Sequence, residues 1–281
     1  MRRFLSTRSA ICLFAFLSWR GEALAVEESA VKKIADNLFV LEEAYNQEPG
    51  VIQHIQVLQS DPKRGEWNYS FTEEWPVPDD RNQLSITVPL TRTKETGFGI
   101  DDLWLNYRLQ LVGVGGEGDL AIAPRLSVSI PTGDYRKGIG RGSTGFQLNV
   151  PASLDIGPSF TAHFNAGLTL TPNARAVDGS KATTIDTNAG VALVWLPVHW
   201  VNAFVEVAHL TEAEVVAENH THRVQTWVVS PALRFAIDFA SGLQIVPGVA
   251  APIEMSGDDV HFTVVAYLSF EHPLWTPESK E

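Results

Sequence analysis

The feature that most constrains this chain is a series of long stretches in which apolar and polar residues alternate with a period of two. The sequence RLSVSI at residues 125–130, for example, alternates at every position. Successive side chains of a β-strand point to opposite faces, so this alternation predicts strands. Twelve such stretches follow one another, near residues 51–60, 65–74, 82–91, 99–111, 118–130, 144–156, 159–170, 185–196, 200–210, 223–237, 242–251 and 259–271.

The length of these stretches favours a membrane protein. Several contain ten or more residues, whereas strands of soluble proteins average about five or six and a tilted membrane-spanning strand needs about 9–11. One face is nearly all Leu, Val, Ile and Phe, and the other carries Asn, Gln, Ser, Thr and Gly with a few charges. Twelve long strands closed in one layer enclose more volume than small side chains fill, so the polar face would line a wet interior and the apolar face would meet lipid. We therefore predict an all-β, 12-stranded antiparallel outer-membrane β-barrel over residues 51–271.

The connections between the later strands alternate in length, as expected for long outer loops and short periplasmic turns. Long connections are predicted at 131–143, 171–184 and 211–222, short ones at 157–158, 197–199 and 238–241, and an intermediate one at 252–258. With twelve strands, both termini would lie on the periplasmic side. Trp195, Trp200, Phe160 and Phe239 lie in or beside the short turns, and aromatic residues suit the membrane–water interface.

The first 25 residues are typical of a secretory signal peptide. Arg2, Arg3 and Arg8 precede an apolar run of about ten residues, and Ala23-Leu24-Ala25 forms an A-x-A cleavage site. Mature protein would then begin at Val26 and contain no cysteine, because Cys12 lies in the removed part.

Residues 26–50 are predicted to form a periplasmic or plug-like segment. The residues at helical spacing are Val31, Ile34, Ala35, Leu38 and Leu41, which predicts a short N-terminal helix, although LFVL at 38–41 could equally form a strand. The chain would end in a tail over residues 272–281.

Charge and motif patterns argue against several other functions. With 21 Lys and Arg against 33 Asp and Glu, the net charge is −12, which is not the basic footprint of a nucleic-acid binder.

Glycine-rich residues 138–142 precede a strand rather than a helix, so a flexible outer loop is favoured over a dinucleotide site and no cofactor is expected. His220 and His222, near Glu212, Glu214 and Glu218, lack an evident third fixed ligand, so no metal is expected. His163 and His261 share the inward face with Ser153 and Ser269, but without a G-x-S-x-G motif we expect no catalytic residues and no enzyme.

Charged residues in the inward phase are the candidate lumen-lining residues. An arginine or lysine facing lipid at mid-bilayer costs about 2–4 kcal/mol, so these side chains should point into the barrel. They could form a constriction that filters solutes, or they could form internal salt bridges that fill the barrel, and the sequence favours neither. The candidates are Arg108, Arg125, Asp155, Glu206 and Arg234.

One part of the chain carries a family resemblance. The text GFGIDDLWLNYRLQL is followed by a strand that ends in Ile130-Pro131-Thr132-Gly133-Asp134, and then by a loop with Gly138, Gly140, Gly142 and Gly145. From Phe98 to Pro151 the sequence resembles the outer-membrane protein family of the phenol meta-degradation pathway. The resemblance implies a transporter-like β-barrel that moves hydrophobic or aromatic compounds, with Pro131, Thr132, Gly133 and Asp134 in a motif loop.

Together these observations predict an outer-membrane channel of a Gram-negative cell for small hydrophobic or aromatic molecules. The expected partners are outer-membrane lipid, a small-molecule solute and the barrel-assembly machinery, with no nucleic acid. A structural or binding barrel that transports nothing is the first alternative, and a barrel enzyme acting on lipids is the second.

Overall fold

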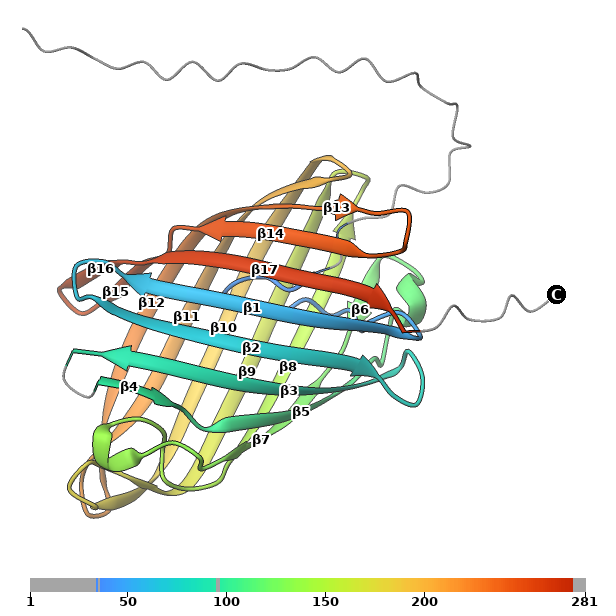
Figure 1. Cartoon of the computed structure of the whole chain (residues 1–281). Helices are drawn as coiled ribbons and strands as arrows, with labels where there is room; N and C mark the ends of the chain where they lie inside the picture. The colour runs from blue at the N-terminus through green and yellow to red at the C-terminus, as the bar shows by residue number, and fades with distance from the viewer. Residues whose placement is uncertain (1–33, 35, 95–96, 275–281) are drawn as a thin grey trace, which may run out of the picture. The chain divides into compact units, whose positions relative to one another are not determined.

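The computed structural model describes residues 34, 36–94 and 97–274. The predicted signal peptide lies outside these residues, as does most of the predicted tail. The described chain forms a closed antiparallel barrel of twelve strands, several of which are interrupted by a bend (Figure 1). This architecture confirms the predicted barrel.

The uninterrupted strands are β1 (Val51–Asp61), β2 (Glu66–Pro76), β3 (Asn82–Thr93), β8 (Gly145–Ile156), β9 (Phe160–Arg175), β10 (Lys181–Val198) and β11 (Val201–Ala217). Each remaining strand consists of two segments: β4 (Gly97–Ile100) with β5 (Leu103–Leu109), β6 (Leu120–Ile122) with β7 (Arg125–Ile130), β12 (His220–Phe235) with β13 (Ile237–Asp238), β14 (Gln244–Ala250) with β15 (Ile253–Ser256), and β16 (Asp259–Phe262) with β17 (Val264–Pro273). Two single-turn 3₁₀ helices lie in connections, η1 (Val114–Gly116) and η2 (Tyr135–Lys137). No helix within the described residues is long and apolar enough to cross a membrane.

The barrel closes where the first strand pairs with the last. β1 and β17 are antiparallel in continuous register from Val51 opposite Pro273 to Ser60 opposite Val264. We call the end at which β1 begins and β17 ends the terminal end, and the other end the loop end.

The two faces of the wall differ as the alternation predicts. Leu126 is 58% exposed on the outside, whereas the next residue, Ser127, is 3% exposed and faces the interior. Other exposed apolar residues on the outside include Phe146, Leu168, Val191 and Leu233. A broad apolar outer surface with small polar residues inside is the pattern of a barrel that sits in lipid.

Two predicted long loops are wrong, because most of their residues extend the strands. β9 and β10 continue to Arg175 and from Lys181, and β11 and β12 are joined by only Glu218 and Asn219. Beyond a membrane both faces of a hairpin meet water, so the strand continues after its apolar residues stop. The loss of alternation in the sequence therefore marks the edge of the apolar band and not the end of the strand. The connection over residues 131–144, which contains η2, is a true loop.

Candidate functional site: a lumen filled by the N-terminal segment

Ile34 and residues 36–50, which we call the lumen segment, lie inside the barrel. The segment passes Arg234, reaches its greatest depth near Leu41 and Glu42, and returns to the terminal end, where Val51 begins β1. It contains no helix in its described residues, so the predicted N-terminal helix is wrong there. The apolar residues at helical spacing instead contact the wall, as Leu38 and Leu41 pack with Phe204 and Val194 in a cluster inside the barrel.

Side chains of the wall replace the hydrogen bonds that a helix would have made. The carboxylate of Glu206, which is fully buried on β11, accepts the N–H groups of Val40 and Leu41 at 2.9 Å each, and that of Phe39 at 3.4 Å. Four further wall side chains accept N–H groups of the segment: Asn165 from Glu42, Ser153 from Ala44, Gln110 from Asn46, and Gln83 from Gln47. Because a buried N–H group without a partner is costly, these acceptors make an extended segment stable inside the barrel.

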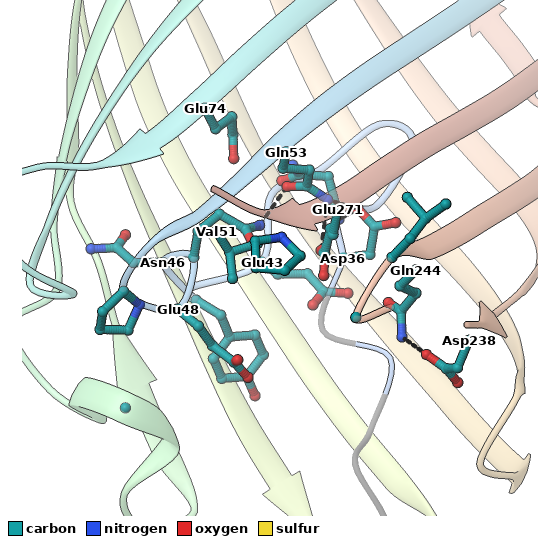
Figure 2. Close-up of a pocket in the computed structure, with 18 of the residues that line it drawn as sticks. Asp36, Glu43, Asn46, Glu48, Val51, Gln53, Glu74, Asp238, Gln244 and Glu271 are labelled. Carbon is teal, nitrogen blue, oxygen red and sulfur yellow. Dashed lines mark hydrogen bonds between the residues drawn. The ribbon is translucent and has the colours of Figure 1, made fainter. Parts of the chain in front are cut away.

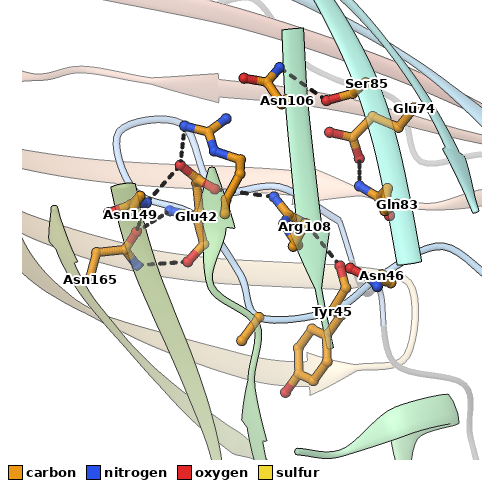
Figure 3. Close-up of polar contacts among 12 residues, drawn as sticks. Glu42, Tyr45, Asn46, Glu74, Gln83, Ser85, Asn106, Arg108, Asn149 and Asn165 are labelled. Atoms are coloured by element: carbon orange, nitrogen blue, oxygen red, sulfur yellow. Dashed lines mark hydrogen bonds and ion pairs between the residues drawn. The ribbon is translucent and has the colours of Figure 1, made fainter. Parts of the chain in front are cut away.

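Glu42 is the centre of one group of ionic contacts (Figure 3). Its carboxylate lies 2.7 Å from Arg125 Nη2 and 3.2 Å from Arg108 Nη2, and it accepts a 2.7 Å hydrogen bond from Asn149. Burial by itself raises the pKa of Glu42, but Arg125 and Arg108, helped by Asn149, outweigh it and hold the pKa below its usual value. Glu42 is thus a partly buried anion that two wall arginines stabilise.

A second group forms around Arg234 on β12. Its guanidinium is 1% exposed, lies 2.8 Å from Glu43 Oε1 and donates to the backbone carbonyls of Ile34, Asp36 and Asn37. Asp36 accepts hydrogen bonds from Tyr267, Ser269 and Gln53 on the closing strands. Each acid of the segment in these contacts therefore meets a matched set of donors on the wall.

Two wall glycines make room for apolar side chains of the segment. A Cβ added at Gly190 would lie 2.7 Å from Leu41 Cδ2, and one added at Gly248 would overlap the ring of Phe39. Phe39 in turn contacts the rings of Phe204 and Tyr267, with centroids 5.1 and 4.7 Å away. The wall therefore complements this segment in shape as well as in charge.

Cavities lie on both sides of the lumen segment. One, of about 680 Å³, opens toward the terminal end and is lined by six carboxylic acids, namely Asp36, Glu43, Glu48, Glu74, Asp238 and Glu271 (Figure 2). The other, of about 500 Å³, lies beyond Val40, Leu41 and Glu42 and is bounded by Trp104, Arg125, Arg141 and Asp186. The two cavities share no lining residue: residues 40–42 of the segment line the second, whereas residues 36, 37, 43 and 45–49 line the first, so the segment lies between them.

All five predicted lumen residues face the interior, but they do not form one cluster. Arg108 and Arg125 are cross-strand neighbours that meet at Glu42, whereas Arg234 meets Glu43 and Glu206 binds backbone N–H groups. Asp155 lies apart from these contacts and accepts a 2.7 Å hydrogen bond from Thr161. The sequence reasoning missed Asp36, Glu42 and Glu43; the signal that could have found them was the presence of acids in a short, otherwise apolar stretch before a barrel with inward arginines.

The motif loop is anchored rather than loose. Asp102 accepts the N–H groups of Gly133 and Arg141, and Ile139, which belongs to the loop, is 2% exposed and packs against Gly99. Gly140 has φ +79°, and a Cβ there would lie 2.5 Å from Asp102 Oδ1. Asp134 accepts from the backbone N–H of Arg136 at the start of η2. Gly140 thus permits a close approach of the loop backbone to Asp102, whose hydrogen bonds fix the loop.

The structure does bring Ser153 and His163 together. Ser153 Oγ lies 2.8 Å from His163 Nδ1, and His163 Nε2 lies 3.9 Å from Glu43 Oε1. Both residues are at most 1% exposed, and Ser153 Oγ also accepts the Ala44 N–H. In this arrangement the pair binds the lumen segment and is closed to a substrate. His220 and His222 are exposed, and no group of three or more metal-ligating side chains occurs in the described part of the chain.

Comparison with known proteins supports the fold. No family model and no curated protein matches the sequence. Among solved structures, the COG4313 outer membrane channel from Pseudomonas putida F1 matches 82% of this chain and 97% of its own with a TM-score of 0.63, at 10% identity. The NanC porin matches 79% of this chain and 100% of its own with a TM-score of 0.52, at 7% identity. This chain therefore has the fold of outer-membrane channel and porin barrels, while the family drawn from residues 98–151 is not confirmed.

Proposed function

We propose that this protein is an outer-membrane channel for small hydrophobic or aromatic molecules, and that the lumen segment closes it in the conformation described here. The two separate cavities on either side of the segment carry the proposal. A barrel with a purely structural role could fill its interior with wall side chains. This barrel instead keeps two spaces and separates them by a segment bound through hydrogen bonds and ion pairs.

The proposed location and partners rest on the wall and on the predicted signal peptide. Exposed apolar side chains such as Leu126, Leu168 and Leu233 would contact outer-membrane lipid. The signal peptide would direct export, and a β-barrel of this kind would use the barrel-assembly machinery. The hydrophobic or aromatic solute class rests on the family resemblance of residues 98–151. No enzymatic role is proposed, because the Ser153–His163 pair is covered by the segment.

The test compares wild-type protein with a Glu42→Gln/Glu43→Gln variant in planar bilayers and in liposomes. The two substitutions remove the ion pairs to Arg108, Arg125 and Arg234, so we expect more frequent channel opening and faster entry of a small aromatic solute. Glu117→Gln, which removes one exposed charge from the loop at the terminal end, is the control.

Heat-modifiable migration on a gel would establish that each barrel is folded. If the folded double variant passed no more ions or solute than wild-type protein, the segment would not be the closure. If neither protein passed any solute, the structural alternative would replace the channel.

A further inference from the structure

Two histidines meet on the outer face of the seam where the barrel closes. His54 belongs to β1 and His272 to β17, the first and last strands. Their neighbours Gln53 and Glu271 hydrogen-bond to each other inside the lumen, so the alternation of a strand directs both imidazoles outward. Both lie near the terminal end of the seam, where His272 stands opposite Ile52.

The distance between the two rings fits a shared metal ion. His54 Nε2 and His272 Nε2 are 3.1 Å apart, with ring centroids at 5.3 Å and ring planes 29° apart. Zinc binds imidazole nitrogen at about 2.0–2.1 Å in tetrahedral geometry, which places two nitrogen ligands about 3.4 Å apart. A few tenths of an ångström of side-chain movement would therefore convert the pair into two ligands.

A carboxylate stands where it would orient the first of these ligands. Glu73 Oε2 on β2 lies 3.8 Å from His54 Nδ1. The Glu73 carboxylate favours the tautomer of His54 that carries its proton on Nδ1. In this tautomer the lone pair of His54 Nε2 points at His272. Histidine ligands of metals are usually held in this way by a carboxylate at the other ring nitrogen. His54 is 28% exposed and lies near the terminal end of the seam, where the wall meets the aqueous phase, so an ion and the water ligands that complete its coordination would enter from that end.

We infer that His54 and His272 form a two-histidine site for a divalent transition-metal ion such as Zn²⁺ or Cu²⁺, oriented by Glu73. Imidazole is a preferred ligand of these ions. Without metal, His272 Nε2–H donates a hydrogen bond to His54 Nε2. When a metal ion binds, the His272 proton moves from Nε2 to Nδ1, so that both neutral rings present an Nε2 lone pair and no net proton is released. The bound ion would connect residues that are 218 positions apart in sequence, across the junction of the first and last strands.

The test is zinc titration of the purified full chain without a histidine tag, followed by calorimetry and by thermal unfolding. We expect one zinc ion per chain and a higher unfolding temperature with zinc. His54→Ala and His272→Ala should each lower zinc affinity by more than tenfold and abolish the temperature shift. Glu73→Gln should retain binding but lower affinity about tenfold, as loss of an orienting partner does. His199→Ala, which removes a histidine from the β10–β11 turn at the same end, should change neither result.

Absence of stoichiometric zinc binding in wild-type protein would overturn the inference. Unchanged zinc affinity in His54→Ala or in His272→Ala would overturn it as well. Should the alanine variants fail to fold, Cu²⁺ bound to wild-type protein provides a second measurement. Its electron paramagnetic resonance spectrum should show coupling to two imidazole nitrogens, and a spectrum without them would refute the site.

Discussion

Replacing Glu42 by glutamine should loosen the lumen segment without unfolding the barrel. The substitution preserves shape but removes the charge that faces Arg125 at 2.7 Å and Arg108 at 3.2 Å. Removing one partner of a buried ion pair costs about 3–5 kcal/mol, because the remaining charge is left uncompensated. The Glu42 side chain is 18% exposed, and glutamine can still accept a hydrogen bond, so we expect the substitution to weaken binding of the segment to the wall by about 2–3 kcal/mol. At about 1.4 kcal/mol per factor of ten, the released segment should become roughly 30- to 150-fold more populated.

Hydrogen exchange measures this population at backbone groups that Glu42 does not itself bind. The N–H groups of Val40 and Leu41 donate to Glu206, so they exchange when the segment leaves the wall. Their protection should fall by the same factor in Glu42→Gln, while amides of β8–β11 and the Glu117→Gln control keep theirs. If protection of Val40 and Leu41 were unchanged in the folded variant, the Glu42 contacts would not hold the segment.

Three further predictions concern the pKa of Glu42, the contact of Gly248 with Phe39, and the outward-facing side chain of Leu126. The folded-state pKa of Glu42 lies below the ordinary value of 4.5, so its stabilisation is present above that pH and is lost as pH falls through the folded-state pKa. The difference in segment protection between wild-type protein and Glu42→Gln should therefore narrow as the pH is lowered below 4.5, and a difference that stays constant to the lowest pH at which the barrel remains folded would contradict it. Gly248→Ala should displace Phe39 and expose the segment to exchange. In a Phe39→Ala background the same substitution should cost much less, because only the tighter contact of the new methyl group with the Leu233 carbonyl remains; additive effects in this cycle would show that Gly248 and Phe39 do not interact. Leu126→Arg should destabilise the membrane-inserted barrel by about 2–4 kcal/mol if it lies near the midplane, while Leu126→Phe should fold normally; equal yields of heat-modifiable barrel would place residue 126 away from lipid.

The wall of the barrel was predictable because its signal is local and repeated. Each strand needs only alternation, and a shift by one residue would turn Leu126 into the lumen and Ser127 into the lipid. The same phase placed Arg108, Arg125, Asp155, Glu206 and Arg234 inside. What alternation cannot reveal is where a strand ends once both faces are polar, and this is why residues 171–184 and 211–222 were predicted to be loops.

The lumen segment was not predictable in the same way, because its structure depends on partners distant in sequence. Helical spacing of Ile34, Leu38 and Leu41 fits a helix, but it fits equally a segment that contacts a curved wall at intervals. The choice depends on acceptors such as Glu206 and Asn165, which are 165 and 123 positions from the groups they bind. For the same reason alternation alone does not decide whether the lumen arginines form a constriction or internal salt bridges, because their partners Glu42 and Glu43 lie in a segment far away in sequence.

The direction in which the lumen segment is attached has a mechanical consequence. The segment runs into the lumen from Ile34 and returns to the terminal end at Val51, with Arg234 holding the carbonyls of Ile34, Asp36 and Asn37. A tension applied to the chain before Ile34 would load these contacts first, then those of Glu206, and only afterwards those of Glu42. Because Arg234 also pairs with Glu43, which follows Glu42 in sequence, the same guanidinium would resist both the first and the last step of such an extraction.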